Sequence, residues 1–379
     1  ETYILVDFAA CSTEIRDLFN DVSDLNRIFM RLQLEYGTEL KERKSAIIFD
    51  EVQLAPKARQ AIKYLVKDGR YDYIETGSLI SIRKNVKNIL IPSEEVKLHM
   101  YPMDYEEFKW ALGDTATIKL LQNCFNGRTS LGDATNRKLM RDFRLYMLVG
   151  GMPQAVSAYL ETNNLEKVDS VKRSIITLYE DDFNKIDQSG NISKMFRQIP
   201  AQLTSNANRY LTWRATDGTR NSNLAELISE MKESMVVNMA YHANDPSAGM
   251  ALHQAPDKYK MFVGDTGLFV TLAFWDKKFT DNTIYHKLLS DKLNADLGYV
   301  YENVIAQMLK AAGHELYYYT FPTDSGKHNY EVDFLIADED KVSPVEVKSS
   351  GYKAHASLDA FCGKFSARIK NKYLIYTKD

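Results

Sequence analysis

The sequence has few cysteines, no long apolar run and little excess charge, and each absence excludes a class of protein. Its 3 cysteines are far apart and have no CxxC or Cys/His ligand spacing, so we expect neither a disulfide framework nor a zinc site. No run of about 18 apolar residues could span a bilayer. The first residues lack the basic segment and apolar core of a signal peptide. We therefore expect a cytoplasmic protein that does not associate with a membrane.

The charge and length of the chain narrow the class further. A net charge of −3 argues against a protein coated in nucleic acid, although local basic patches remain compatible with it. With 379 residues, of which 45% are hydrophobic and 26% charged, the chain has the composition of an ordinary globular protein. Because domains typically hold about 100–200 residues, we expect two to four of them.

The first 90 residues alternate between strand-like and helix-like patterns. Short apolar runs at 3–9, 45–51 and 71–79 are separated by stretches whose apolar residues recur at helical spacing. Such alternation predicts βαβ units and a parallel sheet covered by helices on both faces. Residues 101–185 are predicted to be mainly helical. In residues 191–240 two helical segments precede a strand-like stretch, an order typical of a winged-helix module.

An acidic pair follows the second predicted strand, in the stretch "SAIIFDEVQ". It places Asp50 and Glu51 at the carboxyl end of a strand, where α/β proteins bind ligands. In ATP-hydrolysing folds, such an Asp holds the Mg²⁺ shell and the Glu polarises the attacking water. Alone the pattern is common, because many strands run into charged loops. The third predicted strand, however, ends in Thr76-Gly77-Ser78, and a polar side chain there could sense the γ-phosphate or position the water.

These two strands resemble the Walker B and sensor strands of a prokaryotic family of AAA+ ATPases. The resemblance implies ATP and Mg²⁺ as cofactors, nucleotide-binding roles for Asp50 and Ser78, and a catalytic role for Glu51. No GxxxxGK[ST] motif occurs in the 379 residues. In the family that loop precedes the strand at 3–9, so we expect the chain to begin after it, by truncation or disorder. The alternative is an ATPase that has lost its nucleotide site; either way we expect no unaided ATP hydrolysis.

A second set of acidic residues lies in "NYEVDFLIADEDKVSPVEVKSS", residues 329–350. Residues two apart share a face of a strand, so Glu346 and Lys348 point the same way. If the two strands of this stretch are neighbours in register, Asp333 joins them. Carboxylate oxygens suit Mg²⁺, and an adjacent lysine can orient or deprotonate a water for attack on a phosphodiester. An isolated E-x-K is more often the solvated face of an edge hairpin.

The spacing of these residues resembles that of the PD-(D/E)xK nuclease superfamily, whose core has the order αβββαβ. Twelve residues separate Asp333 from Glu346, and Glu302 lies on the preceding predicted helix. The resemblance implies that Glu302, Asp333 and Glu346 bind the metal and that Lys348 is catalytic. Val332 stands where the superfamily usually has proline, which is a departure from the pattern.

Together the two resemblances predict a multidomain α/β protein, in the order of a family of uncharacterised prokaryotic ATPases with a restriction-endonuclease-like C-terminal domain. The predicted parts are an AAA+ core lacking its Walker A part at 1–100, a helical lid at 101–185, a winged-helix-like module at 186–265 and a PD-(D/E)xK nuclease-like domain at 266–379.

Two functions fit this organisation. The first is an ATP-regulated, Mg²⁺-dependent DNA-processing enzyme. The alternative is a catalytically inactive sensor or interaction protein that uses the nuclease-like fold to bind DNA or another protein. Residues 341–379 hold eight Lys or Arg against three acids and 190–220 hold five against one, so we expect DNA contacts there. The sequence does not decide whether the protein forms a homo-oligomer, because many but not all AAA+ modules act as rings.

Overall fold

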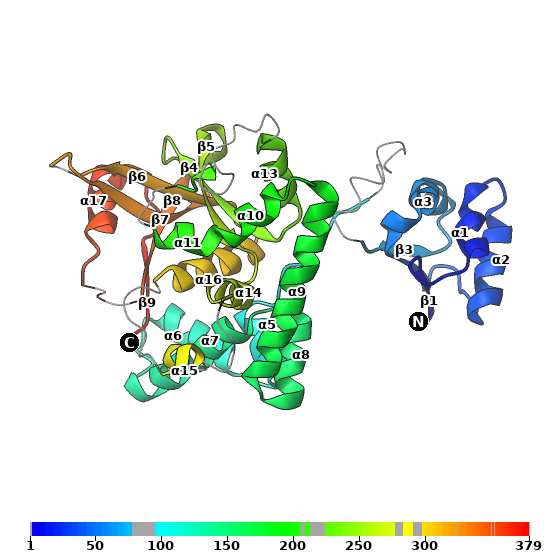
Figure 1. Ribbon diagram of the computed structural model, residues 1–379, viewed down its shortest axis with the longest axis horizontal. Coiled ribbons are helices and arrows are strands. Elements are labelled where there is room, and N and C mark those ends of the chain that lie inside the picture. The colour runs from blue at the N-terminus through cyan, green and yellow to red at the C-terminus, as the bar shows by residue number, and fades with distance from the viewer. Residues whose placement is uncertain are drawn as a thin grey trace. The chain divides into compact units, whose positions relative to one another are not determined.

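A computed structural model describes residues 2–77, 95–205, 209–212, 224–276, 283–290, 298–323, 325–349, 351 and 353–378. The chain divides into two compact units, an N-terminal unit of residues 1–100 and a C-terminal unit of residues 101–379 (Figure 1). Among the described helices, none has both the length and the apolar character needed to cross a bilayer.

The N-terminal unit has a parallel sheet, which confirms the predicted α/β core. Its strands have the order β1-β2-β3, and β1 and β3 both run parallel to β2. They are β1 (Thr2–Asp7), β2 (Ser45–Asp50) and β3 (Asp72–Glu75). The helices of this unit are α1 (Thr13–Asp17), α2 (Leu25–Tyr36) and α3 (Pro56–Asp68), with short 3₁₀ helices η1 (Leu18–Asn20) and η2 (Val52–Leu54).

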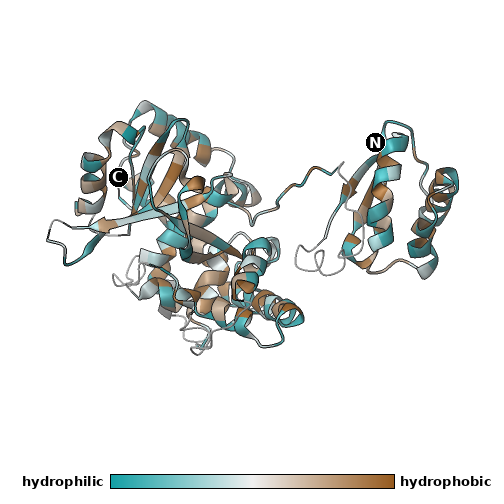
Figure 2. Cartoon of the chain, turned by 90° about the horizontal axis from the view of Figure 1, so that it is seen from above, coloured by the Kyte–Doolittle hydropathy of each residue, from teal (hydrophilic) through white to brown (hydrophobic). Residues whose placement is uncertain are grey.

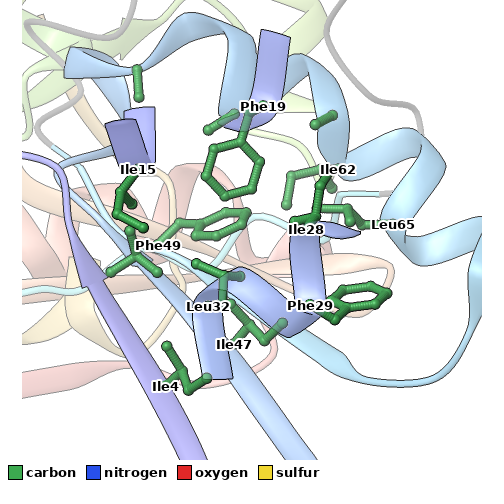
Figure 3. Packing of buried hydrophobic residues seen from close by; sticks show 14 of the residues in the cluster. Ile4, Ile15, Phe19, Ile28, Phe29, Leu32, Ile47, Phe49, Ile62 and Leu65 are labelled. Atoms are coloured by element: carbon green, nitrogen blue, oxygen red, sulfur yellow. The ribbon is translucent and has the colours of Figure 1, made fainter. Parts of the chain in front are cut away.

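All three helices contribute to one apolar cluster on a single face of this sheet (Figure 3). Phe19 and Phe49 meet edge to face there, with ring centroids 5.1 Å apart. On the other face Tyr3 is 62% exposed and Ile74 52% exposed. Within the described residues, the expectation that helices cover both faces is therefore wrong. The strand pattern alone could not reveal this, because apolar residues occupy both faces of the strands.

The C-terminal unit begins with helices, as predicted for residues 101–185. Figure 2 shows both hydrophobic and hydrophilic residues along them, as helices that pack on one side require. A capping box between Asp104 and Glu107 begins the first helix, and Pro153 begins the fourth. These helices are α5 (Tyr105–Ala111), α6 (Thr117–Gly127), α7 (Asp133–Val149), α8 (Pro153–Thr162) and α9 (Leu165–Ile186).

The strand-like stretch that we expected to belong to a winged-helix module is instead part of a hairpin in a larger sheet. Its strands β4 (Val237–Ala243) and β5 (Gln254–Val263) belong to a six-stranded sheet of order β5-β4-β6-β7-β8-β9. Because β4 is buried along nearly its whole length, it needs a neighbour on each edge, and it pairs in parallel with β6. The predicted boundary at 265/266 thus cuts through one sheet. The preceding helices are α10 (Asn191–Arg197), α11 (Ile199–Thr204) and α13 (Leu224–Glu233).

The last part of the chain has the predicted element order αβββαβ. Strands β6, β7 and β8 are antiparallel neighbours, and β9 runs parallel to β8. The elements are α16 (Gly298–Ala311), β6 (Leu316–Pro322), β7 (Asn329–Asp338), β8 (Lys341–Lys348), α17 (Ala356–Lys364) and β9 (Tyr373–Tyr376). Helices α14 (Thr266–Ala273) and α15 (Thr283–Leu289) precede them, and 3₁₀ helices η3 (Met250–Leu252) and η5 (Ser366–Arg368) are also described.

Two buried charged side chains, Asp265 and Lys172, connect helices of the C-terminal unit through hydrogen bonds. Asp265 caps α14 by accepting a hydrogen bond from Leu268 N at 2.8 Å, and it accepts another from Gly151 N at 2.5 Å. The buried ammonium of Lys172 donates to the carbonyl oxygens of Leu148 at 2.6 Å and Gly267 at 3.2 Å. Burial raises the pKa of Asp265 and lowers the pKa of Lys172 to about 8. These contacts hold α7, α9 and α14 together.

Candidate functional site

The carboxyl edge of the N-terminal sheet brings polar side chains from its strands together. Asp50 ends β2, in register with Asp7 at the end of β1. Just after β3, Thr76 donates its hydroxyl to Asp50 Oδ1, and its amide donates to Phe49 O at 2.8 Å. A parallel sheet binds ligands at this edge, so Asp50 is positioned where an α/β protein would hold a nucleotide or its metal. Ser78 lies outside the described residues, and its nucleotide-binding role stays a prediction.

Glu51 has an unusual backbone conformation. It lies in the left-handed region at φ 53° and ψ 43°, which residues other than glycine seldom adopt. Its side chain accepts a hydrogen bond from Gln53 Nε2. Strained conformations of this kind occur preferentially at functional sites, where the surrounding structure fixes them. The predicted role of Glu51 in polarising a water is compatible with this position beside Asp50.

A partly buried ion cluster lies behind this edge. Glu75, the last residue of β3, has Oε2 3.8 Å from Arg59 Nε, while Glu95 Oε2 lies 3.1 Å from Arg59 Nη2. Burial raises the pKa of Glu75 from its ordinary value of 4.5 to about 7, and repulsion from Glu95 adds to the effect of burial. The single guanidinium of Arg59 thus neutralises two carboxylates only in part.

This cluster predicts a pH dependence of stability. Between pH 4.5 and 7 the unfolded chain has lost the Glu75 proton that the folded unit keeps, so the free energy of unfolding falls as pH rises. Allowing for solvent screening of a partly exposed group, we expect Glu75→Gln to stabilise the N-terminal unit by about 1–2 kcal/mol at pH 8 relative to pH 5. Urea unfolding followed by far-UV circular dichroism measures this.

The control for the loss of one negative charge is Glu39→Gln, because the Glu39 side chain is exposed. Equal stability changes for the two variants at both pH values would contradict the assignment to Glu75.

In the C-terminal unit, β7 and β8 bring Asp333, Glu346 and Lys348 together. Asp333 Oδ2 accepts a hydrogen bond from Val347 N at 2.8 Å, and Lys348 Nζ lies 2.8 Å from Glu346 Oε1. The other oxygen of this glutamate, Oε2, is buried and has no hydrogen-bond partner among the described residues. Because Glu346 is only 3% exposed, the solvated face of an ordinary hairpin does not describe it. A buried carboxylate oxygen without a partner is costly unless a cation compensates it.

The predicted third carboxylate, Glu302 on α16, lies next to a lysine that the sequence analysis missed. Lys260 on β5 has its Nζ 3.8 Å from Glu302 Oε2, and it donates a hydrogen bond to Glu331 on β7. The ammonium also lies 5.4 Å from the ring centroid of Tyr318. The one signal for this residue in the sequence is a lysine inside the apolar run "YKMFV" of a strand.

The electrostatics of the cluster follow from burial and like charges. Burial raises the pKa of Asp333 well above its ordinary range, and the carboxylates of Glu302 and Glu346 raise it further. Burial also raises the pKa of Glu346, although the ammonium of Lys348 opposes this rise. Burial disfavours the charged form of Lys260, but the surrounding carboxylates outweigh it and raise its pKa. Lys260 is thus held as an ammonium inside the cluster.

These residues fit a divalent ion with two carboxylate ligands better than one with three. In the described part of the chain, no three His, Cys, Asp or Glu side chains are grouped so that they could hold a metal ion. Mg²⁺ is, however, commonly bound by one or two carboxylates, with water and substrate phosphate oxygens completing its shell. Asp333 and the free oxygen of Glu346 offer that number, whereas Glu302 is paired with Lys260.

The two basic patches expected to contact DNA are only partly described. In the first, Arg214 and Arg220 lie outside the described residues, and Arg209 is exposed. In the second, Lys370 pairs with Asp338 at 3.0 Å and with Glu339 at 2.7 Å, and Arg368 pairs with Asp245. These ion pairs reduce the positive charge that residues 341–379 can offer to phosphates.

Three parts of the chain match family models. Residues 140–278 match a domain of unknown function (DUF8612), and residues 297–379 match another (DUF4143). No curated protein and no solved structure matches the chain. Neither of these two families carries a function to the C-terminal unit. Residues 2–109 match an AAA domain, and this similarity supports an ATPase-type, nucleotide-binding function for the N-terminal unit.

Proposed function

We propose that this protein couples an AAA-type ATPase to Mg²⁺-dependent processing of DNA by its C-terminal unit. The observation that carries the proposal is the buried oxygen Glu346 Oε2, which belongs to a cluster of carboxylates around Asp333 and finds no hydrogen-bond partner in the part of the chain that the structure describes. A divalent cation would supply the missing partner. The match of residues 2–109 to an AAA domain supports the ATPase part.

In the C-terminal unit, Asp333 and Glu346 would hold the ion. When bound, Mg²⁺ would polarise a phosphate oxygen and lower the pKa of a coordinated water. Lys348 is placed to assist, because its ammonium lies 2.8 Å from Glu346 Oε1 and is only partly buried. There it could hold the attacking water or stabilise the charge that develops on the phosphate.

Positive side chains near this cluster support a phosphodiester substrate. Lys258, two residues before Lys260 on β5, donates to Thr320 Oγ1 at 3.0 Å. Burial lowers the pKa of Lys258, and the nearby positive charge of Arg209 lowers it further. Both side chains could neutralise phosphates of a DNA strand that reaches the cluster.

In the N-terminal unit, Asp50 would hold the Mg²⁺ of a bound nucleotide and Glu51 would orient the attacking water. The support is the position of Asp50 at the carboxyl edge of the sheet, together with its hydrogen bond from Thr76. We infer that the nucleotide state regulates the C-terminal unit.

The test is a cleavage assay with the full chain on labelled single-stranded and double-stranded DNA, with Mg²⁺, Mn²⁺ or EDTA, and with or without ATP. We expect metal-dependent cleavage that falls at least 100-fold in Lys348→Met. Lys310→Met, in the last turn of α16 and outside both basic patches, is the matched control and should cleave normally. Metal-independent cleavage, or cleavage that Lys348→Met leaves intact, would contradict the proposed site.

One observation favours a second candidate, a catalytically inactive sensor or interaction protein. The ammonium of Lys260 already neutralises part of the cluster, so the fold does not require a metal to compensate Glu302 and Glu331. In this case the protein binds DNA or another protein with unchanged affinity in EDTA, and no substrate is cleaved.

A further inference from the structure

We propose that Lys260 acts as a fixed cation in place of a second metal ion, so that the acidic cluster takes up a single divalent ion. The inference rests on the metal site of the proposed function and specifies how many ions that site holds. It concerns four carboxylates and two ammonium groups from four elements, namely Glu302 on α16, Glu331 and Asp333 on β7, Glu346 and Lys348 on β8, and Lys260 on β5.

The two lysines divide the cluster into two sides. Lys260 donates to Glu331 and lies 3.8 Å from Glu302, so both carboxylates of that side already have a cation. On the other side, Lys348 lies 2.8 Å from one oxygen of Glu346, and no described residue gives the second oxygen a hydrogen bond. The free coordination capacity therefore lies with Glu346 and Asp333.

Charge balance leads to the same number of ions. When all four carboxylates are ionised, they and the two ammonium groups of the cluster carry a formal charge of −4 + 2 = −2, which one divalent ion neutralises. A second divalent ion would leave an excess of two positive charges in a largely buried region. Such uncompensated buried charge is expensive, so the second ion should not bind while Lys260 is present.

The position of Lys260 suits a permanent role. Lys260 is 7% exposed, and its ammonium lies 5.4 Å from the ring centroid of Tyr318. If the ammonium left the cluster, it would lose its contacts with both the aromatic ring and the carboxylates. It comes from β5, a strand outside the αβββαβ part of the chain. The hairpin β4–β5 therefore supplies the cluster with a second ammonium group, in addition to Lys348 on β8.

The experiment counts Mn²⁺ ions on the full chain by calorimetric titration and by the electron paramagnetic resonance signal of free Mn²⁺, without nucleotide. Each protein is compared with the same protein carrying Glu302→Gln, Glu331→Gln, Asp333→Asn and Glu346→Gln, so that only ions held by the cluster are counted. We expect one ion for the parent and two for Lys260→Met. Lys260→Arg, which keeps the charge, should bind one.

Lys310→Met is the matched control, because this lysine on α16 pairs with Glu315, a carboxylate outside the cluster, at 2.5 Å. It should bind one ion. If Lys260→Met fails to fold, Lys260→Gln, which can still donate to Glu331, carries the same expectation of two ions.

Folded Lys260→Met that binds one ion with parental affinity would overturn the role of Lys260 and leave the metal site intact. A parent that binds no Mn²⁺ would overturn the metal site of the proposed function, and the inference about Lys260 with it. Two ions on the parent would overturn the inference alone.

Discussion

Replacing Gly151 by alanine is expected to destabilise the C-terminal unit by about 3 kcal/mol or more. A Cβ atom at this position would lie 2.0 Å from Met103 O and 2.7 Å from Met103 N. Both are backbone atoms, so no side-chain rotation can relieve the overlap. The Met103 amide also donates to Gly151 O at 2.8 Å, and the Gly151 amide donates to the buried Asp265. Moving the chain apart would break these bonds as well.

Tryptophan fluorescence during urea unfolding measures this effect selectively. The 3 tryptophans, Trp110, Trp213 and Trp275, all belong to residues 101–379, so their signal reports only the C-terminal unit. The matched control is Gly363→Ala on α17, where a Cβ would meet no atom within 4 Å. Because alanine favours a helix over glycine, this control should be neutral or up to about 1 kcal/mol more stable. Equal midpoints for the two variants would show that the Met103 backbone yields, contrary to the structure.

Local pattern predicted the elements of this fold better than their partners. The alternation of short apolar runs with helical stretches identified β1, β2 and β3 and their parallel arrangement. It did not reveal that β4 pairs with β6 as well as with β5: Ala240 lies opposite Leu316, far along the chain. A strand that is apolar on both faces must be central in some sheet, but the sequence does not say which sheet. This strand-like stretch was therefore assigned to a winged-helix module.

Side chains do not alternate strictly between the two faces of β7 near Asp333. Between Val332 and Leu335, β7 takes three steps where β6 takes two, from Tyr319 to Tyr317. This bulge puts Val332 and Leu335 in the same apolar cluster, whereas strict alternation pairs Val332 with Phe334. Bulges often occur beside functional sites, where they redirect a side chain. The two-residue period of a strand predicted that Asp333 and Glu346 would lie close. It could not predict the bulge, because a single extra residue leaves no periodic pattern in the sequence.

Lys260 shows what a search based on motif spacing leaves out. Glu302, Asp333, Glu346 and Lys348 follow one another in the order of a motif, so spacing alone could select them. Lys260 precedes that motif and reaches the cluster only because β5 joins the same sheet through β4. Its local signal, a lysine inside the apolar run "YKMFV", does not say which carboxylates it meets until that pairing is known.

Asp333→Asn is expected to change metal affinity and stability in opposite directions. Asparagine keeps the shape of the side chain but removes a charge from a metal ligand, so Mn²⁺ affinity should fall about 100-fold. The same change should stabilise the metal-free protein by about 1–3 kcal/mol at pH 8, because it removes an ionised carboxylate that burial and like charges destabilise. Calorimetric titration and urea unfolding by tryptophan fluorescence measure the two effects.

The pH dependence fixes the sign of the Asp333 effect. Because the folded state raises the pKa of Asp333, the stability of the metal-free parent should fall as pH rises above 4, and Asp333→Asn should remove part of that fall. Asp338→Asn on the same strand is the contrasting control. Hydrogen bonds from Ser343 and Lys370 lower the pKa of Asp338, so losing its charge should slightly destabilise the protein at neutral pH. If both variants destabilise the metal-free protein equally, Asp333 is an ordinary surface carboxylate and the acidic cluster is not a metal site.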